Sequence, residues 1–377
     1  MKLKSMRSEL LTGFQRVQGV VEKRNTMPIL SNILLEAKED QVVLFATDLE
    51  IAIRGSYAAE VSQPGGVTVS ARKLYEIIRE LPEGPITITS EDNHSVRIEA
   101  GRSEFKVMGL PPQEFPAMPS VEGEPLMPVG RKVLSELIRK TAFAAGDNDA
   151  RYILNGILMT LFMKDKKPAL RLVGTDGHRL AVIERSLEDG KAGGALKHPT
   201  DQTAIVPKKA ALEIKKLLDE NDQEPEIGVS KNQLIFRRGS LLLLARLMEG
   251  SYPNYQQVVP KENGKRATVR RAELEGALRR VSILSREKTN AIKMVLEPGS
   301  LTLSSSNPEA GEARETVEVN YKDEGIAAGF NARYLLDILS AMDGEEVVME
   351  FKDGLSPCVV RQPGDRDYLC VVMPMRV

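Results

Sequence analysis

The sequence has little of several residue types on which many enzymes and secreted proteins depend. It has no Trp, two Cys and three His, namely Cys358, Cys370, His94, His178 and His198. Two Cys without neighbouring His form neither a disulfide framework nor a zinc site, and three scattered His disfavour chemistry that needs several imidazoles. We therefore expect a chain of the reducing cytoplasm that holds no metal and no cofactor.

Long apolar runs and an excess of one charge are also missing. No run approaches the ~18 apolar residues of a membrane span, and the opening MKLKSMR lacks the apolar stretch of a secretory signal. The 52 Lys and Arg nearly balance the 53 Asp and Glu, so the net charge is −1. Any basic surface for nucleic acid must therefore come from an uneven distribution of charge.

What the 377 residues do contain is a threefold repeat. Each copy has a strand end, a Ser, Pro or Asn suited to start a helix, and apolar residues at i, i+3 and i+4. These copies begin at Val69, Val206 and Phe330. A second helix precedes each copy, over 8–24, 131–140 and 270–288, and a small polar pair follows that helix at Thr47-Asp48, Thr175-Asp176 and Ser306-Asn307.

The repeat predicts an α+β chain of three similar domains, each with two helices and antiparallel strands. We place the boundaries at 1–125, 126–261 and 262–377. Duplication without a functional meaning is the alternative, but three equal units favour a periodic surface.

The positive charge is concentrated in the expected helices. Over the six helical segments, 21 Lys and Arg face 13 Asp and Glu, which leaves +8 on the helices and −9 on the rest of the chain. A shared basic face suits a phosphate backbone, although Lys and Arg are also good helix formers on any solvated face. No aromatic residues interleave with the charges, so we expect contacts to duplex backbone that are independent of base sequence.

The segment Gly174-Thr175-Asp176-Gly177-His178-Arg179 offers groups for catalysis. An enzyme could use Asp176 to orient His178 as a general base. However, Asp176 aligns with Asp48 and Asn307 in the other copies, where no His follows. This position therefore favours a turn residue, and the chain shows none of the phosphate-loop, nucleophile-elbow or HExxH patterns.

The C-terminal segment is unusually apolar. Residues Leu369 to Val372 are typical of a last core strand. Met373-Pro374-Met375 cannot all pair in a sheet, because Pro lacks an N–H. These residues could line a groove, since flexible Met side chains adapt to varied partners.

Several stretches together resemble the sliding-clamp family, the β subunits of bacterial DNA polymerase III, over the full length of the chain. The matching stretches are Met27–Asn32, Thr47–Glu50, Arg151–Gly156, Thr175–Leu180, Tyr252–Tyr255 and Val372–Arg376. The resemblance implies three similar domains per chain and two chains closed head to tail into a ring, with helices lining the hole. It also implies a non-catalytic processivity factor that encircles double-stranded DNA and tethers the replicative polymerase.

The resemblance assigns residues to three surfaces. A pocket for short linear motifs of the polymerase α subunit, the clamp-loader δ subunit, other polymerases and repair proteins would comprise Leu154, Thr175, Gly177, His178, Arg179, Leu180, Pro253, Val258, Val371, Met373, Pro374, Met375 and Arg376. DNA contacts would fall at Arg24, Asn148, Arg151, Tyr152 and Ile153, to which we add the basic helix residues Arg72, Lys73, Lys208 and Lys209. The homodimer contact would join Phe105 and Val107 of one chain to Ile283 and Leu284 of the other.

At three positions on these surfaces, the chain differs from the family pattern. Gln257 stands where we expect Arg, Pro357 where we expect Ser, and Ile153 where we expect Tyr. Two other hypotheses stay open from the sequence: a hydrolase that uses Asp176 and His178, and a monomeric repeat scaffold without a DNA role.

Overall fold

The computed structural model describes the whole chain except residues 22–26, 188–201, 221, 222, 231, 287, 288 and 377. The described residues form two compact units. Unit 1 comprises those of 1–131 and 212–247, and unit 2 comprises those of 132–187, 202–211 and 248–376. The expected central domain thus contributes residues to both units, because its strands continue the sheets on either side.

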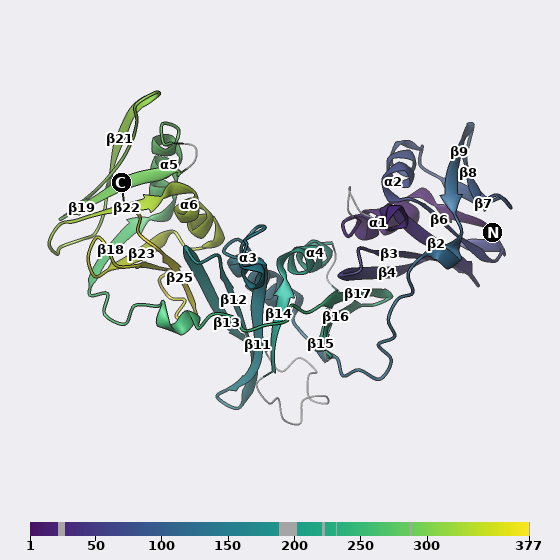
Figure 1. The fold of residues 1–377 in the computed structure, drawn as a ribbon, viewed down its shortest axis with the longest axis horizontal. Helices are drawn as coiled ribbons and strands as arrows, with labels where there is room; N and C mark the ends of the chain where they lie inside the picture. Colours follow the sequence, from purple (N-terminus) through teal and green to yellow (C-terminus); the bar gives the residue numbers. More distant parts are fainter. Residues whose placement is uncertain (22–26, 188–201, 221–222, 231, 287–288, 377) are drawn as a thin grey trace. The chain divides into compact units, whose positions relative to one another are not determined.

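Unit 1 is built on one antiparallel sheet of thirteen described strands, most of which are labelled in Figure 1. Their order is β10-β15-β16-β17-β4-β3-β2-β6-β9-β8-β7-β1-β5. The strands are β1 (Lys2–Met6), β2 (Asn32–Lys38), β3 (Gln41–Thr47), β4 (Ile51–Ala58), β5 (Glu60–Gln63), β6 (Gly65–Ser70), β7 (Pro85–Ser90), β8 (Ser95–Ala100), β9 (Ser103–Leu110), β10 (Met127–Pro128), β15 (Glu226–Val229), β16 (Gln233–Arg238) and β17 (Leu241–Arg246). The pairing of β4 with β17 joins strands that lie far apart in the sequence.

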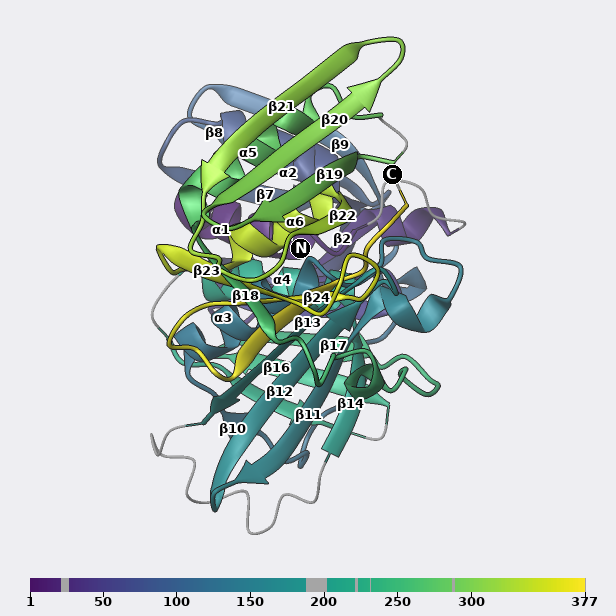
Figure 2. The same ribbon diagram turned by 90° about the vertical axis from the view of Figure 1, so that its left-hand side faces the viewer.

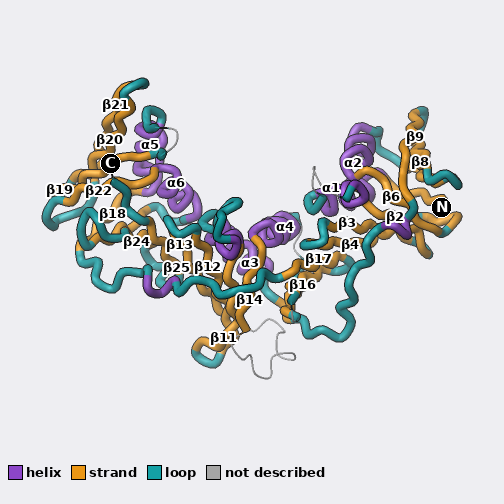
Figure 3. The backbone as a smooth tube through the Cα atoms, viewed as in Figure 1, coloured by secondary structure: helices purple, strands orange, loops and turns teal. Residues whose placement is uncertain are grey.

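Two helices of unit 1, α1 (Arg7–Gln18) and α2 (Ala71–Glu80), lie side by side against its strands (Figure 3). The buried side of α1 repeats at helical spacing, with Leu10, Phe14 and Val17. Gly13 lets α1 approach the sheet closely, since a Cβ there would lie 2.6 Å from the Cδ1 of Leu44. The apolar face of the helix thereby covers β3 and β4.

Unit 2 contains two antiparallel sheets. The larger sheet has the order β14-β11-β12-β13-β25-β24-β23-β18, and the smaller has the order β21-β20-β19-β22. The strands are β11 (Gly156–Lys164), β12 (Lys167–Thr175), β13 (Arg179–Ser186), β14 (Gln202–Pro207), β18 (Lys265–Arg270), β19 (Ala291–Glu297), β20 (Ser300–Asn307), β21 (Gly311–Glu318), β22 (Ile326–Asn331), β23 (Glu346–Phe351), β24 (Cys358–Arg361) and β25 (Tyr368–Val372).

The helices of unit 2 are α5 (Arg271–Ser282), α6 (Ala332–Ala341) and nearly all of α3 (Arg131–Ala142). Helices α5 and α6 contact each other and cover one face of the smaller sheet, which lies in front of them in Figure 2. Helix α4 (Lys208–Leu218) begins in unit 2, and its later residues belong to unit 1.

Within the described residues, the six helices lie where the sequence predicts them, but two of them end well before the expected residue. The segments expected over 8–24 and 270–288 end as helices at Gln18 and Ser282. Asn331 caps α6 by accepting from the N–H groups of Arg333 and Tyr334, whereas the side chain of Ser70 makes no such bond to α2. Within the observed bounds the six helices carry 17 Lys and Arg against 8 Asp and Glu, so the positive excess is retained.

None of the helices in the described ranges is both long enough and apolar enough to cross a membrane.

Candidate functional site

An apolar hollow of about 130 Å³ opens on the larger sheet of unit 2. The residues that line this apolar hollow are Arg151, Leu154, Thr175, Gly177, Arg179, Leu180, Pro253, Tyr255, Val258, Val371 and Met373. Beneath it lies a core cluster of Val173, Leu180, Val182, Val359 and Val371. The hollow is therefore a gap above well-packed aliphatic side chains.

Strand pairing sets the floor of the hollow. β13 and β25 are antiparallel neighbours, and Leu180 lies opposite Val371. These two side chains are 2% and 0% exposed, whereas Val258 and Met373 at the rim are 41% and 36% exposed. A buried apolar floor with an exposed apolar rim suits the side chain of a partner molecule more than water.

A tight turn between β12 and β13 forms one wall. The Thr175 hydroxyl donates to the carbonyl of Arg179 at 2.6 Å and accepts from the N–H of Gly177 at 3.0 Å. The Asp176 carboxylate accepts from the N–H groups of His178 and Arg179 at 2.9 and 3.0 Å. Gly177 has φ +83°, a conformation that glycine adopts without strain.

Unit 1 contains the same turn at the equivalent place in its sequence. Thr47 bonds to the carbonyl of Ile51 and the N–H of Leu49, and Asp48 accepts from the N–H groups of Glu50 and Ile51. The prediction that Asp176 is a turn residue thus fits its geometry. Its carboxylate is occupied by backbone N–H groups and by Arg179, which gives the general-base hypothesis for His178 no support.

Arg179 holds this wall in place. Its Nε donates to Asp176 at 3.0 Å, and its Nη1 donates to the carboxylate of Asp337 in α6. The guanidinium carbon lies 4.6 Å from the ring centroid of Tyr334 and 5.5 Å from that of Phe143. Because Arg179 is only 9% exposed, we conclude that it positions the turn and α6 and is not a group free to meet solvent.

The end of the chain is tied to the same wall. The N–H of Met373 donates to the carbonyl of His178 at 2.9 Å. The exposed His178 ring stacks on Tyr334, with 6.3 Å between the ring centroids. Burial raises the pKa of Tyr252, whose hydroxyl lies near the carbonyls of Gly156 and Val173 below the hollow. The rim is therefore fixed by backbone contacts before any partner arrives.

Nine of the thirteen residues expected at a peptide pocket line this one hollow. His178 stands beside it, and Pro374 follows Met373 without lining it. Met375 and Arg376 line a different hollow, against β19, β20 and β21, where the N–H of Met375 donates to the carbonyl of Gly329 at 2.8 Å. The expectation that Met375 walls the same groove as Leu180 is wrong in this structure, because the backbone turns away after Pro374 to pair with β22.

Sequence reasoning missed two lining residues. Tyr255 belongs to the matching stretch Tyr252–Tyr255 but is not among the residues expected at the pocket, and Arg151 is expected only at DNA. Arg151 donates to the carbonyl of Asp176 at 2.7 Å and to Asp149 at 2.8 Å, so it braces the turn. Hydrogen bonds from the side chain and backbone of Arg151 lower the pKa of Asp149 to about 2.

Four of the residues expected at DNA gather at one corner of unit 2. Asn148, Arg151 and Tyr152 are exposed in the segment before β11, and Tyr152 is 58% exposed. Lys208 donates to the carbonyl of Ala145 at 2.9 Å and to Asp147 at 2.8 Å, which places it beside that segment. The corner thus combines two cations, an amide and a phenol.

The other expected DNA residues are distributed more widely. Ile153 and Lys209 are half-buried, and Arg24 lies outside the described residues. On α2 of unit 1, Arg72 and Lys73 are exposed and both reach Glu76, at 2.7 and 3.6 Å. Their charge is therefore partly neutralised on the helix itself.

Of the four residues expected at a dimer contact, Phe105 and Ile283 are exposed, whereas Val107 and Leu284 are half-buried. Phe105 lies on β9 and is 39% exposed. Residues 103–108 of β9 pair with β8 on one side, and only Gly109 and Leu110 pair with β6 on the other. Within the described residues, the second edge of β9 is therefore unpaired at Phe105. In unit 2, Ile283 follows α5 directly and is 77% exposed, and β21 is one of the two edge strands of the smaller sheet. Exposed apolar side chains beside open strand edges invite pairing with another chain.

Within the described ranges, no three His, Cys, Asp or Glu side chains are grouped so that they could hold a metal ion.

Three family models match the chain in succession. They are the DNA polymerase III beta subunit N-terminal domain over residues 1–119, the central domain over 128–254 and the C-terminal domain over 256–376. The chain is 38% identical to the beta sliding clamp of Caulobacter vibrioides over 379 residues, with 100% of both chains covered. Crystal structures of the DNA polymerase sliding clamp from Caulobacter crescentus and of the Bartonella birtlesii sliding clamp bound to griselimycin are similar to it over the full length of each chain, with TM-scores of 0.90 and 0.91 at 38% and 35% identity.

Proposed function

We propose that this chain, which belongs to the family of DNA polymerase III beta subunits and is a DNA sliding clamp, closes as a head-to-tail dimer around duplex DNA and docks its partners at the apolar hollow of unit 2. It is not an enzyme, and its contribution to replication is to confer processivity. The observation that carries the docking proposal is the hollow itself, with its Leu180 and Val371 floor and exposed Val258 and Met373 rim.

The DNA contacts are proposed to be weak and independent of base sequence. The six helices carry 17 basic and 8 acidic residues, yet cations such as Arg72 and Lys208 are partly paired with carboxylates of the chain. A ring that bound phosphates tightly would not slide. Moderate positive charge with topological enclosure suits a clamp, and Arg24, Arg72, Lys73, Asn148, Arg151, Tyr152, Ile153, Lys208 and Lys209 are the proposed contacts.

The ring is proposed to close through unlike surfaces. Phe105 and Val107 on β9 of one chain meet Ile283 and Leu284 after α5 of the other, and a head-to-tail contact of this kind closes only when the rotation fits. Three domains per chain, with boundaries proposed at 1–125, 126–261 and 262–377, give six similar modules in a dimer. Since such a clamp acts on chromosomal DNA, we place it in the cytoplasm.

The docking partners are proposed to be extended segments with Leu or Phe anchors. The replicative polymerase α subunit, the clamp-loader δ subunit, other polymerases and repair proteins would take turns at the hollow. Apolar anchors account for most of the binding free energy at such sites, and the flexible Met373 side chain lets one rim fit several of them. Tethering then raises the effective concentration of polymerase at the primer end.

A retention assay tests the ring. The protein is loaded by a clamp loader onto nicked circular DNA, separated by gel filtration at moderate salt, and separated again after the circle is cut by a restriction enzyme. We expect retention on the circle and loss from the linear DNA. Equal retention on both forms would mean ordinary electrostatic binding and would contradict enclosure.

A further inference from the structure

We propose that the apolar hollow continues into a basic groove, which binds acidic residues flanking the apolar anchors of a partner segment. The basic groove is defined by Lys261, Arg266, Lys352, Arg361 and Arg366. The inference rests on the proposed docking function and adds to it the charge of the segment that docks.

The two depressions that make up the groove join each other and the hollow. The first depression, of about 530 Å³, has the lining residues Val258 and Met373 in common with the apolar hollow and is also lined by Lys352. The second depression, of about 480 Å³, has the lining residues Pro260 and Lys261 in common with the first and is also lined by Arg366. An extended chain seated in the hollow can therefore pass from an apolar rim to a charged surface without leaving the protein.

The cations of the groove are only partly neutralised by the protein. Within the described residues, neither Lys261 nor Arg366 forms an ion pair, and Lys352 approaches Glu262 only at 3.9 Å, with both side chains more than half exposed. Arg266 and Arg361 share one carboxylate, that of Glu350, at 3.3 and 3.2 Å.

The third acidic residue of the groove, Asp365, forms its ion pairs with cations outside the groove. It lies 2.6 Å from Nη2 of Arg185 and 3.5 Å from Nζ of Lys140, both outside the groove. Five groove cations thus face two carboxylates that are available to them, Glu262 and Glu350. The excess positive charge is available to a partner's carboxylates.

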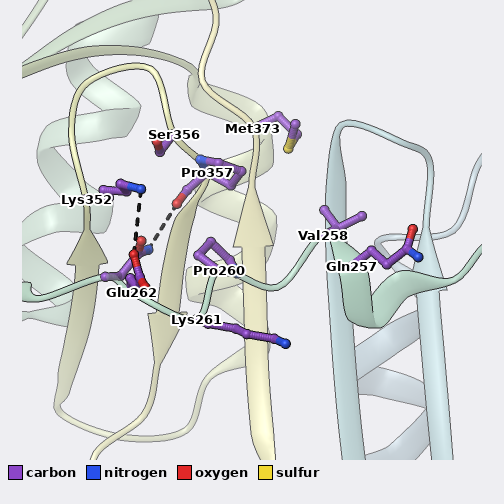
Figure 4. Close-up of a pocket in the computed structure, with 10 residues that line it drawn as sticks. Gln257, Val258, Pro260, Lys261, Glu262, Lys352, Ser356, Pro357 and Met373 are labelled. Carbon is purple, nitrogen blue, oxygen red and sulfur yellow. Dashed lines mark hydrogen bonds and ion pairs between the residues drawn. The ribbon is translucent and has the colours of Figure 1, made fainter.

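The backbone beside Lys261 is held in place by hydrogen bonds of Asn263. The side-chain amide of Asn263 donates to the carbonyl of Glu350 at 2.8 Å and to that of Pro357 at 3.1 Å. Figure 4 shows Pro260 and Lys261 between the pair Val258 and Met373 and the pair Glu262 and Lys352, with Lys261 making no marked contact. A fixed backbone with free ammonium groups lowers the ordering cost of binding.

The surroundings favour an acidic peptide over a nucleic acid. Among the described residues, no aromatic side chain lines either part of the groove, so bases would find no stacking surface there. A peptide with apolar anchors and a few carboxylates beside them matches both the hollow and the groove.

Three labelled peptides with one common Leu and Phe core test the inference by fluorescence anisotropy. They carry four Glu before the core, four Glu after it, or four Gln on both sides. We expect one acidic peptide to bind about three- to tenfold more tightly than the Gln peptide at low salt. That advantage should disappear near 0.5 M salt, because the contacts are exposed.

Charge reversal locates the effect. Lys261→Glu should remove the advantage of the acidic peptide and leave the affinity for the Gln peptide unchanged. Lys322→Glu makes the same charge change at an exposed lysine outside the groove and should keep the advantage. Thermal unfolding of both variants should match that of the unaltered protein.

The possible results separate the two proposals. If all three peptides bind equally, the basic groove is overturned while docking at the hollow stands. If none binds, docking at the hollow fails and the inference falls with it. If a single-stranded oligonucleotide displaces the acidic peptide and Lys261→Glu abolishes its binding, the groove serves nucleic acid and the acidic-peptide assignment is overturned.

Discussion

Leu180 of β13 and Val371 of β25 lie directly opposite each other in antiparallel register, although one belongs to the middle of the chain and the other to its last strand. Their side chains are nearly inaccessible and form the floor of the apolar hollow. The docking site therefore exists only when the final strand is in place. Changes at the chain end should consequently affect partner binding before they affect DNA enclosure.

The rim residue Met373 provides the first prediction. Met373→Ala should weaken binding of a Leu- and Phe-containing peptide by about tenfold, because a buried apolar side chain contributes ~1.5–3 kcal/mol. Met163→Ala is the matched control, since Met163 is exposed to a similar degree and lies outside the hollow. Isothermal titration of both variants measures the effect, and equal affinities would place the anchors elsewhere.

Arg179 should matter for stability as well as for binding. Arg179→Met removes the ion pairs to Asp176 and Asp337 but keeps most of the side-chain volume. We expect the free energy of unfolding to fall by about 2–4 kcal/mol, because two carboxylates lose a largely buried partner. Urea denaturation measures this loss.

His178→Ala is the control for Arg179. His178 is an exposed neighbour in the same turn, so its removal should change stability by less than about 0.5 kcal/mol. If the two variants lost equal stability, the positioning role assigned to Arg179 would be wrong.

The proposed dimer contact can be tested by replacing one of its exposed apolar residues with a charged residue. Ile283→Asp should convert the dimer to a 41.6 kDa monomer, because an aspartate cannot be desolvated at an apolar contact without a large cost. Leu355→Asp is a stringent control, since Leu355 is 85% exposed but lies outside the expected contact. Sedimentation equilibrium should report a monomer for the first variant and a dimer for the second; the reverse result would relocate the interface.

Protonation of Glu136 at low pH should lower the free energy of unfolding of unit 2. Burial by itself would raise the pKa of this carboxyl, but hydrogen bonds from Arg185 at 2.7 Å and an ion pair with Lys140 at 2.9 Å outweigh burial and lower the pKa below 4.5. A carboxyl with a lower pKa in the folded state adds stability above its unfolded pKa and loses it as the pH falls through the folded value. The free energy of unfolding should therefore drop as the pH falls below about 4.5.

Glu136→Gln should flatten that drop, because the variant has no carboxyl to protonate. Urea midpoints measured from pH 7 to pH 3 provide the comparison. Glu318→Gln, at an exposed glutamate of β21 that makes no ion pair within the described residues, should keep the full slope. An unchanged slope in Glu136→Gln would show that other carboxylates dominate the acid response.

Much of the local structure was readable from the sequence, because helices and short strands follow from the spacing of apolar residues along the chain. The last core strand expected over Leu369 to Val372 is present as β25. The turn at Thr175-Asp176 was recognisable from its equivalent at Thr47-Asp48, since both depend on hydrogen bonds within five residues. Membership of the clamp family was carried by such short stretches in the correct order.

Tertiary structure decided which of these elements meet. Many strands alternate in the same way, so their pattern does not specify that β13 pairs with β25 or that Leu180 faces Val371. Nor does it show that Met375 turns away to β22 while Tyr255 enters the hollow. The sequence by itself determined the modules and the family through local spacing and motif order, whereas the hollow and the basic groove depend on long-range register and on the direction of each side chain, which only the folded chain fixes.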